Sequence, residues 1–192
     1  GVVKFTKLAF DEGVHEVKKI LDEGLIAAMN VVGEKFKCNE IFIPEVLISA
    51  KAMQAGTAIL EPHFAKCGIR PVGKVVIGTV KGDLHDIGKN IVGMMLKGAC
   101  FELLDLGIDV GPEKFVEALQ ADTIDIIAMS SLITTSMSWM KETIKILKDS
   151  GLRDKVKIMV GGAPVTKAFA DLIGADAYAK DAATAVEMAR AI

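Results

Sequence analysis

The hydrophobic pattern changes its period near residue 70, and this change constrains the possible folds of the chain more than any other feature. After it, short apolar runs alternate with amphipathic segments. Nearly continuous apolar runs are typical of strands buried on both faces, and strict alternation of strands with helices is typical of a parallel sheet. We expect strands at residues 74–80, 101–106, 125–130, 157–160 and 175–179. We expect the helices that follow them at residues 88–98, 112–120, 136–150, 164–172 and 182–191.

Before residue 70, apolar residues recur at steps of three and four, which predicts amphipathic helices. One stripe runs from Val14 to Phe36, with an interruption expected at Gly24. A second helix is expected to begin at Pro44, because proline suits the first turn of a helix, and Pro62 is expected to kink or end it. A shorter apolar stretch at residues 2–10 precedes both.

The sequence therefore predicts two parts. Residues 1–70 are expected to form a small α-helical bundle, and residues 71–192 an α/β domain, with a linker at 65–71. Five parallel strands favour the order 2-1-3-4-5 of a flavodoxin-like, Rossmann-like sheet. In this order, ligands bind at the loops that follow the first, third, fourth and fifth strands.

Composition argues against two classes of partner. With 23 basic and 25 acidic side chains the formal charge is −2, so the chain lacks the excess of basic residues that holds proteins on nucleic acid. The longest apolar runs, at residues 75–80 and 124–129, are far shorter than the roughly 20 residues that cross a membrane. We therefore expect neither nucleic acid nor membrane as a partner. The three cysteines match no zinc or disulfide pattern, which favours reduced thiols and a cytoplasmic location.

The loop after the first predicted strand contains a histidine flanked by carboxylates. It reads Gly82-Asp83-Leu84-His85-Asp86-Ile87-Gly88. Metal-ligating imidazoles usually donate their second N–H to a carboxylate, so Asp83 strengthens the interpretation of His85 as a metal ligand. Two alternatives stay open, with Asp83 or Asp86 as a helix N-cap and His85 as a solvated loop residue. The loop lacks the glycine patterns that bind dinucleotides or nucleotide phosphates.

The third predicted strand ends in a hydroxyl-rich turn. Thr135 or Ser136 is expected to cap the next helix, which leaves Ser130 and Thr134 without a structural explanation. The fourth strand is followed by the run Gly161-Gly162-Ala163-Pro164. Its two glycines allow another group to approach the backbone closely, and Pro164 is expected to start the following helix.

The fifth predicted strand contributes Tyr178, the single tyrosine of the chain. This side chain is either a packed core residue or a wall of the site, and the sequence leaves both interpretations open.

Together these loops resemble a known signature. Asp83-x-His85-x-x-Gly88, followed by Ser130-x-Leu132 and then Gly161-Gly162, resembles the signature of cobalamin-binding domains of the methionine synthase type. Residues 29–36 and 42–44 look like the helical cap of the same proteins. A chain of this size with both parts is similar to the corrinoid proteins of anaerobic methyltransferase systems.

The resemblance implies a cofactor and a set of partners. The cofactor would be cobalamin or a related cobamide, with its methylated cobalt form as the intermediate. The partners would be a substrate-specific methyltransferase, a second methyltransferase that uses tetrahydrofolate or coenzyme M, and a reductive activation protein. The chain would then be a methyl carrier without a complete reaction of its own. Because both methyltransferases must reach the same face of cobalt, we expect the cap to move about the linker at 65–71.

The resemblance also implies roles for individual residues. His85 would be the lower axial ligand of cobalt, Asp83 would hydrogen-bond its far nitrogen, and Ser136 would extend this relay. The nucleotide tail would run past the loops after the third, fourth and fifth strands, and cap residues would cover the upper face of the corrin. The implied cofactor-binding residues are Gly82, Asp83, Leu84, His85, Asp86, Ile87, Gly88, Ser130, Leu132, Thr134, Gly161, Gly162, Ala163, Tyr178, Ala182, Phe36 and Ile43.

The chain departs from the family pattern at its start. Related proteins usually carry about four cap helices, and here the first is expected to be missing and the second to start late, at residues 2–10.

Three other protein classes compete with this interpretation. A cobalamin-dependent sensor or regulator without methyl transfer is the main alternative, although such proteins usually add a DNA-binding domain. A phospho-receiver domain would need an aspartate at the end of the third strand, where Ser130 stands. An adenosylcobalamin mutase subunit generally lacks the helical cap.

Overall fold

The computed structural model describes residues 1–11 and 16–192, and its N-terminal part is helical. Its elements are α1 (Val2–Asp11), α2 (Val17–Lys19), the π-helix η1 (Ile20–Ile26), α3 (Ala27–Lys37) and α4 (Ile43–Phe64). The chain passes from α2 through η1 into α3 without a break, and the interruption expected at Gly24 takes the form of the π-helix. Val14, the first residue of the predicted stripe, lies outside the described residues. Pro62 lies within the last turn of α4.

The C-terminal part contains the predicted parallel sheet. Its strands are β1 (Lys74–Thr79), β2 (Glu102–Asp105), β3 (Ile126–Ser130), β4 (Lys157–Gly161) and β5 (Ala177–Ala179). Their order is β2-β1-β3-β4-β5 with every pair parallel, which confirms the flavodoxin-like topology. The intervening helices are α5 (Ile87–Gly98), α6 (Pro112–Ala121), α7 (Met137–Asp149), the short 3₁₀ turn η2 (Arg153–Lys155), α8 (Lys167–Ile173) and α9 (Ala182–Ala191).

The start of α8 differs from the prediction. The helix begins at Lys167, and Pro164 lies in the turn that precedes it. Thr166 occupies the N-cap position, where its Oγ1 accepts a hydrogen bond from the Phe169 N–H at 3.1 Å. A threonine cap satisfies an N–H that the first helical turn leaves unpaired, and this local bond fixes the helix start after the proline.

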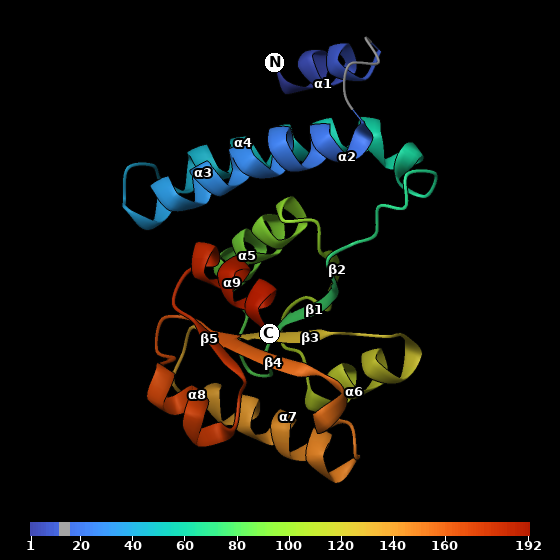
Figure 1. The fold of residues 1–192 in the computed structure, drawn as a ribbon. Coiled ribbons are helices and arrows are strands. Elements are labelled where there is room, and N and C mark those ends of the chain that lie inside the picture. The colour runs from blue at the N-terminus through green and yellow to red at the C-terminus, as the bar shows by residue number, and fades with distance from the viewer. Residues whose placement is uncertain (12–15) are drawn as a thin grey trace.

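The elements are stacked in layers (Figure 1). The N-terminal helices lie over α5 and α9, which cover one face of the sheet, while α6, α7 and α8 cover the other. Successive strand residues point into two different hydrophobic cores. Val75 and Ile77 face the side covered by α5 and α9, and Val76 faces the side covered by α6, α7 and α8. Within residues 1–11 and 16–192, no helix combines the length and apolar composition of a membrane span.

We call the helical elements from α1 to α4 the cap and residues 74–192 the α/β domain. The two meet mainly where α4 contacts α5 and α3 contacts α9. Two polar contacts cross this boundary, an ion pair of 2.8 Å between Lys37 and Glu187 and a 3.3 Å hydrogen bond from Arg190 to Asn30. Beside them lies a space of about 270 Å³ between α3, α5 and α9, which we call the interface crevice. Its lining includes Gly33, whose missing side chain helps to leave the space open.

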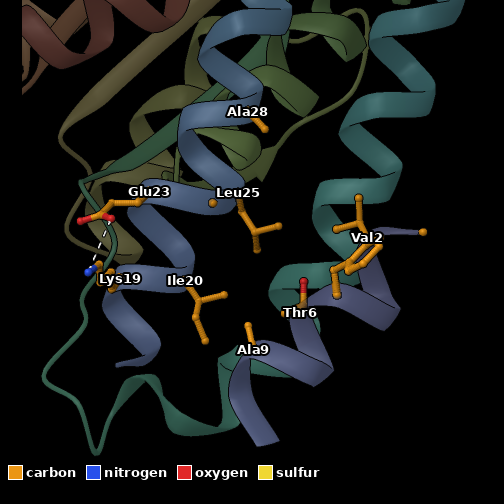
Figure 2. Close-up of a pocket in the computed structure, with 11 residues that line it drawn as sticks. Val2, Thr6, Ala9, Lys19, Ile20, Glu23, Leu25 and Ala28 are labelled. Atoms are coloured by element: carbon orange, nitrogen blue, oxygen red, sulfur yellow. Dashed lines mark ion pairs between the residues drawn. The ribbon is translucent and has the colours of Figure 1, made fainter. Parts of the chain in front are cut away.

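A second cavity lies inside the cap, between α1 and the π-helix (Figure 2). Its volume is about 600 Å³, and apolar side chains such as Val2, Ile20 and Leu25 dominate its lining. An ion pair between Lys19 and Glu23 stands at its side. Every lining residue belongs to the first 28 residues of the chain, so this cavity is separate from the loops that carry the predicted chemistry.

Candidate functional site

The centre of the site is a hydrogen-bonded pair formed by Asp83 and His85. Both residues lie in the loop between β1 and α5, at the carboxyl edge of the sheet. His85 Nδ1 lies 2.7 Å from Asp83 Oδ1, and the His85 backbone N–H donates to the same oxygen at 3.0 Å. The Asp83 side chain is fully buried, whereas the His85 side chain is 55% exposed. The exposed imidazole of His85 is therefore held in place by a buried carboxylate.

The second carboxylate oxygen of Asp83 is held by the loop after β3. Asp83 Oδ2 accepts hydrogen bonds from the Leu132 N–H at 2.6 Å, the Ile133 N–H at 3.3 Å and the Ser136 hydroxyl at 3.1 Å. Burial by itself raises the pKa of Asp83, but the hydrogen bonds from both loops outweigh it and lower the pKa to about 2. Asp83 is therefore an ionised acceptor at neutral pH.

The charge of Asp83 determines the tautomer of His85. An ionised carboxylate can only accept hydrogen bonds, so Nδ1 must carry the proton that lies between the two side chains. In the neutral ring this leaves the lone pair on Nε2. A neutral imidazole whose other nitrogen donates to a carboxylate is the usual form of a metal-ligating histidine.

A buried serine extends the network one step beyond the predicted residues. Ser131 and Ser136 are both buried, and their Oγ atoms lie 2.7 Å apart. The carboxylate is the stronger acceptor, so Ser136 donates to Asp83 and accepts from Ser131. The sequence analysis named Ser136 but missed Ser131. The sequence contains one indication of Ser131, which is its position in the hydroxyl-rich run. The burial of Ser131 depends on how the loops after β1 and β3 pack together, and the sequence does not show this.

The expected helix cap after β3 is not formed by a side chain. Ser136 occupies the N-cap position of α7, but its hydroxyl makes no capping hydrogen bond. The prediction that Thr135 or Ser136 caps this helix was therefore wrong. The reason is the nearby carboxylate of Asp83, which competes for the same hydroxyl.

The paired glycines at the end of β4, Gly161 and Gly162, allow neighbouring backbone to approach closely. At Gly162, where φ is +125°, an added Cβ would lie 1.8 Å from the Ser131 carbonyl oxygen. At Gly161, an added Cβ would lie 2.7 Å from the Ala179 carbonyl oxygen. The missing side chains thus allow the loop after β3 and strand β5 to pack closely against β4.

Several large apolar side chains in the loops after β1 and β3 are exposed. Leu84 is 68% exposed and Ile87 is 70% exposed, and Leu132 of the neighbouring loop is also exposed. Large apolar side chains concentrated in exposed loops are typical of a surface that contacts a ligand or partner. The remaining predicted residues of these loops, Gly82, Asp86, Gly88, Thr134 and Ala163, are exposed as well.

Five predicted site residues belong to other parts of the fold. Tyr178 packs against the core covered by α6, α7 and α8, and Ala182 is buried in the first turn of α9. Phe36 lies near the end of α3 and is half-buried against the cap-side core. Ile43 begins α4 and is exposed. Ser130, the last residue of β3, is half-buried beside Gly161.

A buried lysine next to the site was not predicted from the sequence. Lys89 is almost fully buried in the first turn of α5, where its Nζ donates to Asp105 at 2.5 Å and to Asn90 at 2.7 Å. Asn90 in turn donates to Asp86 at 3.0 Å. This chain of contacts joins the end of β2 to the loop that carries His85.

The donor set of the site suits a metal that is already chelated. Within the described ranges 1–11 and 16–192, no three His, Cys, Asp or Glu side chains gather as a metal-ligand cluster. A bare zinc ion needs three or four protein ligands, whereas a metal held by a tetrapyrrole-like ring needs only axial ones. A single imidazole held by a carboxylate, in loops that expose large apolar side chains, therefore fits a corrinoid.

Comparison with known proteins agrees with this geometry. A family model described as a B12 binding domain matches residues 73–187, and a second model with the same description matches residues 1–61. The chain is 46% identical to the dimethylamine corrinoid protein 2 of Methanosarcina acetivorans over 178 residues, which cover 92% of this chain and 82% of that protein.

Two solved structures have the same fold. A cobalamin-binding protein from Desulfitobacterium hafniense DCB-2 gives a TM-score of 0.76 at 32% identity, over 99% of this chain and 94% of that one. The methanol:cobalamin methyltransferase complex MtaBC from Methanosarcina barkeri gives a TM-score of 0.78 at 32% identity, over 90% of this chain and 66% of that one. Site geometry, family models and relatives agree that the chain belongs to the family of B12-binding corrinoid proteins.

Proposed function

We propose that this chain carries a methyl group between a substrate-specific methyltransferase and a second methyltransferase that passes it to tetrahydrofolate or coenzyme M. The observation that carries the proposal is the exposed His85 imidazole, fixed through Nδ1 by a buried and ionised Asp83. The names of its relatives support it, because one is a dimethylamine corrinoid protein and another belongs to a methanol:cobalamin methyltransferase complex. When bound, a corrinoid supplies the cobalt that takes up and releases the methyl group.

Different residues of the chain would have different roles in binding this cofactor. His85 would ligate cobalt through Nε2, and Asp83 would keep the ring oriented. Ser136 would fix Asp83 from the opposite side. The remaining predicted residues of the loops after β1, β3, β4 and β5 would line the cofactor, and Phe36 and Ile43 would shield its upper face from water. A reductive activation protein is a third proposed partner.

The first test is the visible spectrum of the protein reconstituted with hydroxocobalamin. We expect the wild-type protein to retain the corrinoid with a histidine-ligated spectrum. The His85→Gly variant should fold but lose this spectrum, and added imidazole should restore it, because the removed side chain leaves space for a free ligand. His63→Ala is the matched control, since His63 lies in α4 and packs on Phe10. An unchanged spectrum in His85→Gly would exclude His85 as the ligand.

Methyl transfer is tested separately. The reduced, reconstituted protein is mixed with a purified methylamine or methanol methyltransferase and then with tetrahydrofolate or coenzyme M. We expect uptake of isotopically labelled methyl from one donor class and its appearance in one acceptor. Retention of the corrinoid without labelling from any of these donors would contradict the carrier role and favour a sensor.

Movement of the cap gives a further prediction. Lys37 and Glu187 meet across the boundary at 2.8 Å, so cysteines at these two positions can be joined by a short cleavable cross-linker. The exposed Cys38 and Cys67 are first replaced by Ser. Because both methyltransferases must reach one face of the cofactor, we expect cross-linking to slow methyl transfer by at least about tenfold while the corrinoid stays bound.

Cleavage of the cross-linker should restore the rate, and variants with only one of the two cysteines should be unaffected by the reagent. Full activity of the cross-linked protein would show that transfer does not require the cap to move.

A further inference from the structure

The loop that carries His85 is also held by the segment that follows β2. The Thr79 N–H donates to the Gly107 carbonyl at 3.0 Å, and the Val110 N–H donates to the Thr79 carbonyl at 2.9 Å. The buried Thr79 hydroxyl donates to the His85 carbonyl at 2.9 Å. Residues 107–110 are thereby fixed beside the start of the His85 loop.

Asp109 makes two direct contacts with that loop. Its Oδ1 accepts a hydrogen bond from the Gly82 N–H at 2.7 Å, and its own N–H donates to the Asp83 carbonyl at 3.0 Å. Gly82 has φ of +79° and Asp109 has φ of +53°. Asp109 therefore accepts a hydrogen bond from Gly82 and donates one to Asp83. We call this pair of hydrogen bonds the Asp109 clamp.

The backbone conformation of Asp109 indicates that its tertiary contacts hold it in place. A residue with a Cβ rarely adopts positive φ, although Asp and Asn tolerate it better than other residues. Such a conformation persists where the surrounding structure determines it, and it is frequent at functional sites. The two hydrogen bonds of the clamp, one through the side chain and one through the backbone, hold Asp109 in this conformation.

We propose that Asp109 is a positioning residue that sets the conformation of the His85 loop. This inference rests on the proposed function of His85 as the ligand. The hydrogen bonds of Asp109 go to Gly82 and Asp83 and not to His85. Asp109 fixes the backbone of Gly82 and Asp83, and the carboxylate of Asp83 then holds both the backbone N–H and the ring of His85.

The clamp adds a restraint that the buried network does not supply. Ser136 and the N–H groups after β3 hold only the side chain of Asp83. The backbone that leads into Asp83 passes through Gly82, which is exposed and conformationally permissive. Without Asp109, the Gly82 N–H would bond to water, and the Asp83 carboxylate would be anchored to a looser main chain.

Three substitutions separate the effect of the carboxylate from that of the backbone conformation. Asp109→Asn keeps an acceptor and tolerates positive φ. Asp109→Gly accommodates positive φ but removes the acceptor, and Asp109→Ala loses both. Because a hydrogen bond to a charged group contributes about 1.5 kcal/mol or more, we expect amide exchange at Gly82 to accelerate about tenfold in the Gly and Ala variants. The Asn variant keeps a neutral and therefore weaker acceptor, so its exchange at Gly82 should be at most a few-fold faster than in wild type.

The experiment measures amide exchange by NMR in the cofactor-free protein and the visible spectrum after reconstitution with hydroxocobalamin. In the Gly and Ala variants we expect faster exchange at both Gly82 and His85 and a smaller histidine-ligated fraction. The Asn variant should largely restore both readouts. If the Ala variant does not fold, the Gly and Asn variants still decide the question.

Two results would overturn the inference. Unchanged exchange at Gly82 in Asp109→Gly would show that the clamp does not hold the loop. Faster exchange at Gly82 with unchanged exchange at His85 would show that the clamp does not position the ligand. Failure of the proposed function is distinguishable, since it appears as a wild-type spectrum that His85→Gly does not alter, while the exchange at His85 still reports on Asp109.

Discussion

The Gly162→Ala variant should lose about 3 kcal/mol or more of its free energy of unfolding and fail to retain a corrinoid. The added Cβ would lie 1.8 Å from the Ser131 carbonyl oxygen, so backbone on one side must move. Alanine is also strained at the Gly162 φ of +125°. Overpacking alone typically costs about 1–3 kcal/mol, and here strain adds to it. Urea unfolding followed by circular dichroism measures the loss.

Gly151→Ala is the matched control for this prediction. Gly151 has φ of +67°, but an added Cβ would meet no atom within 4 Å. Its substitution should therefore cost only the backbone strain, about 1 kcal/mol, and leave cofactor binding intact. If both variants lost the same free energy of unfolding, close packing of the loop after β3 would not be the reason for glycine at position 162.

The Asp83→Asn variant should be less stable than wild type at neutral pH, by a margin that narrows in acid. The amide has one acceptor oxygen, while His85 donates to one side of the group and Leu132 and Ser136 donate to the other. At least one buried donor then faces the amide NH₂, which typically costs about 1–3 kcal/mol. The same change should weaken the orientation of His85 and reduce the histidine-ligated fraction.

The pH dependence follows from the lowered pKa of Asp83. Its pKa of about 2 in the folded chain lies below the ordinary value of 3.8, so the ionised group stabilises the fold fully above about pH 4. This contribution, about 2 kcal/mol, is lost as the pH falls from about 4 towards 2. Urea unfolding at pH 7, 5, 4 and 3 should show the free energy of unfolding of the wild type approaching that of Asp83→Asn as the pH falls.

The exposed Asp86 provides the control for this series. Asp86→Asn should differ from wild type by less than about 0.5 kcal/mol across the same pH range. A difference between wild type and Asp83→Asn that stays constant from pH 7 to pH 3 would show that the charge of Asp83 does not contribute to stability.

The sheet was predictable because its signal is local and repeated. The central strands β1, β3 and β4 are short apolar runs such as 126–130, and amphipathic helices separate them. Strand order then followed from general rules of α/β topology. The start of α8 was not predictable in the same way. Pro164 suits a first helical turn, but the Thr166 cap two residues later determines the helix start.

The site was predictable where a residue acts through its own chemistry. A histidine two residues from a carboxylate indicates a ligand with its partner, and the structure places Asp83 and His85 in hydrogen-bond contact. Ser131 and Asp109 were missed because their partners lie in loops that are distant in sequence. The glycine pair at 161–162 indicated a close approach, but only the fold shows that the approaching group is the backbone of Ser131 and Ala179.

Few interactions hold α3 against α9 at the interface crevice. The ion pair between Lys37 and Glu187 is partly exposed, and such pairs contribute at most about 1 kcal/mol. Beside it, the crevice leaves part of the contact between α3 and α9 unfilled. Apolar packing of α4 against α5 holds the rest of this boundary together. Under the proposed carrier role, opening would be a rare fluctuation, and a partner that binds only the open form would select it. Arrival of that partner, rather than any chemical event in this chain, would then decide when the cofactor is uncovered.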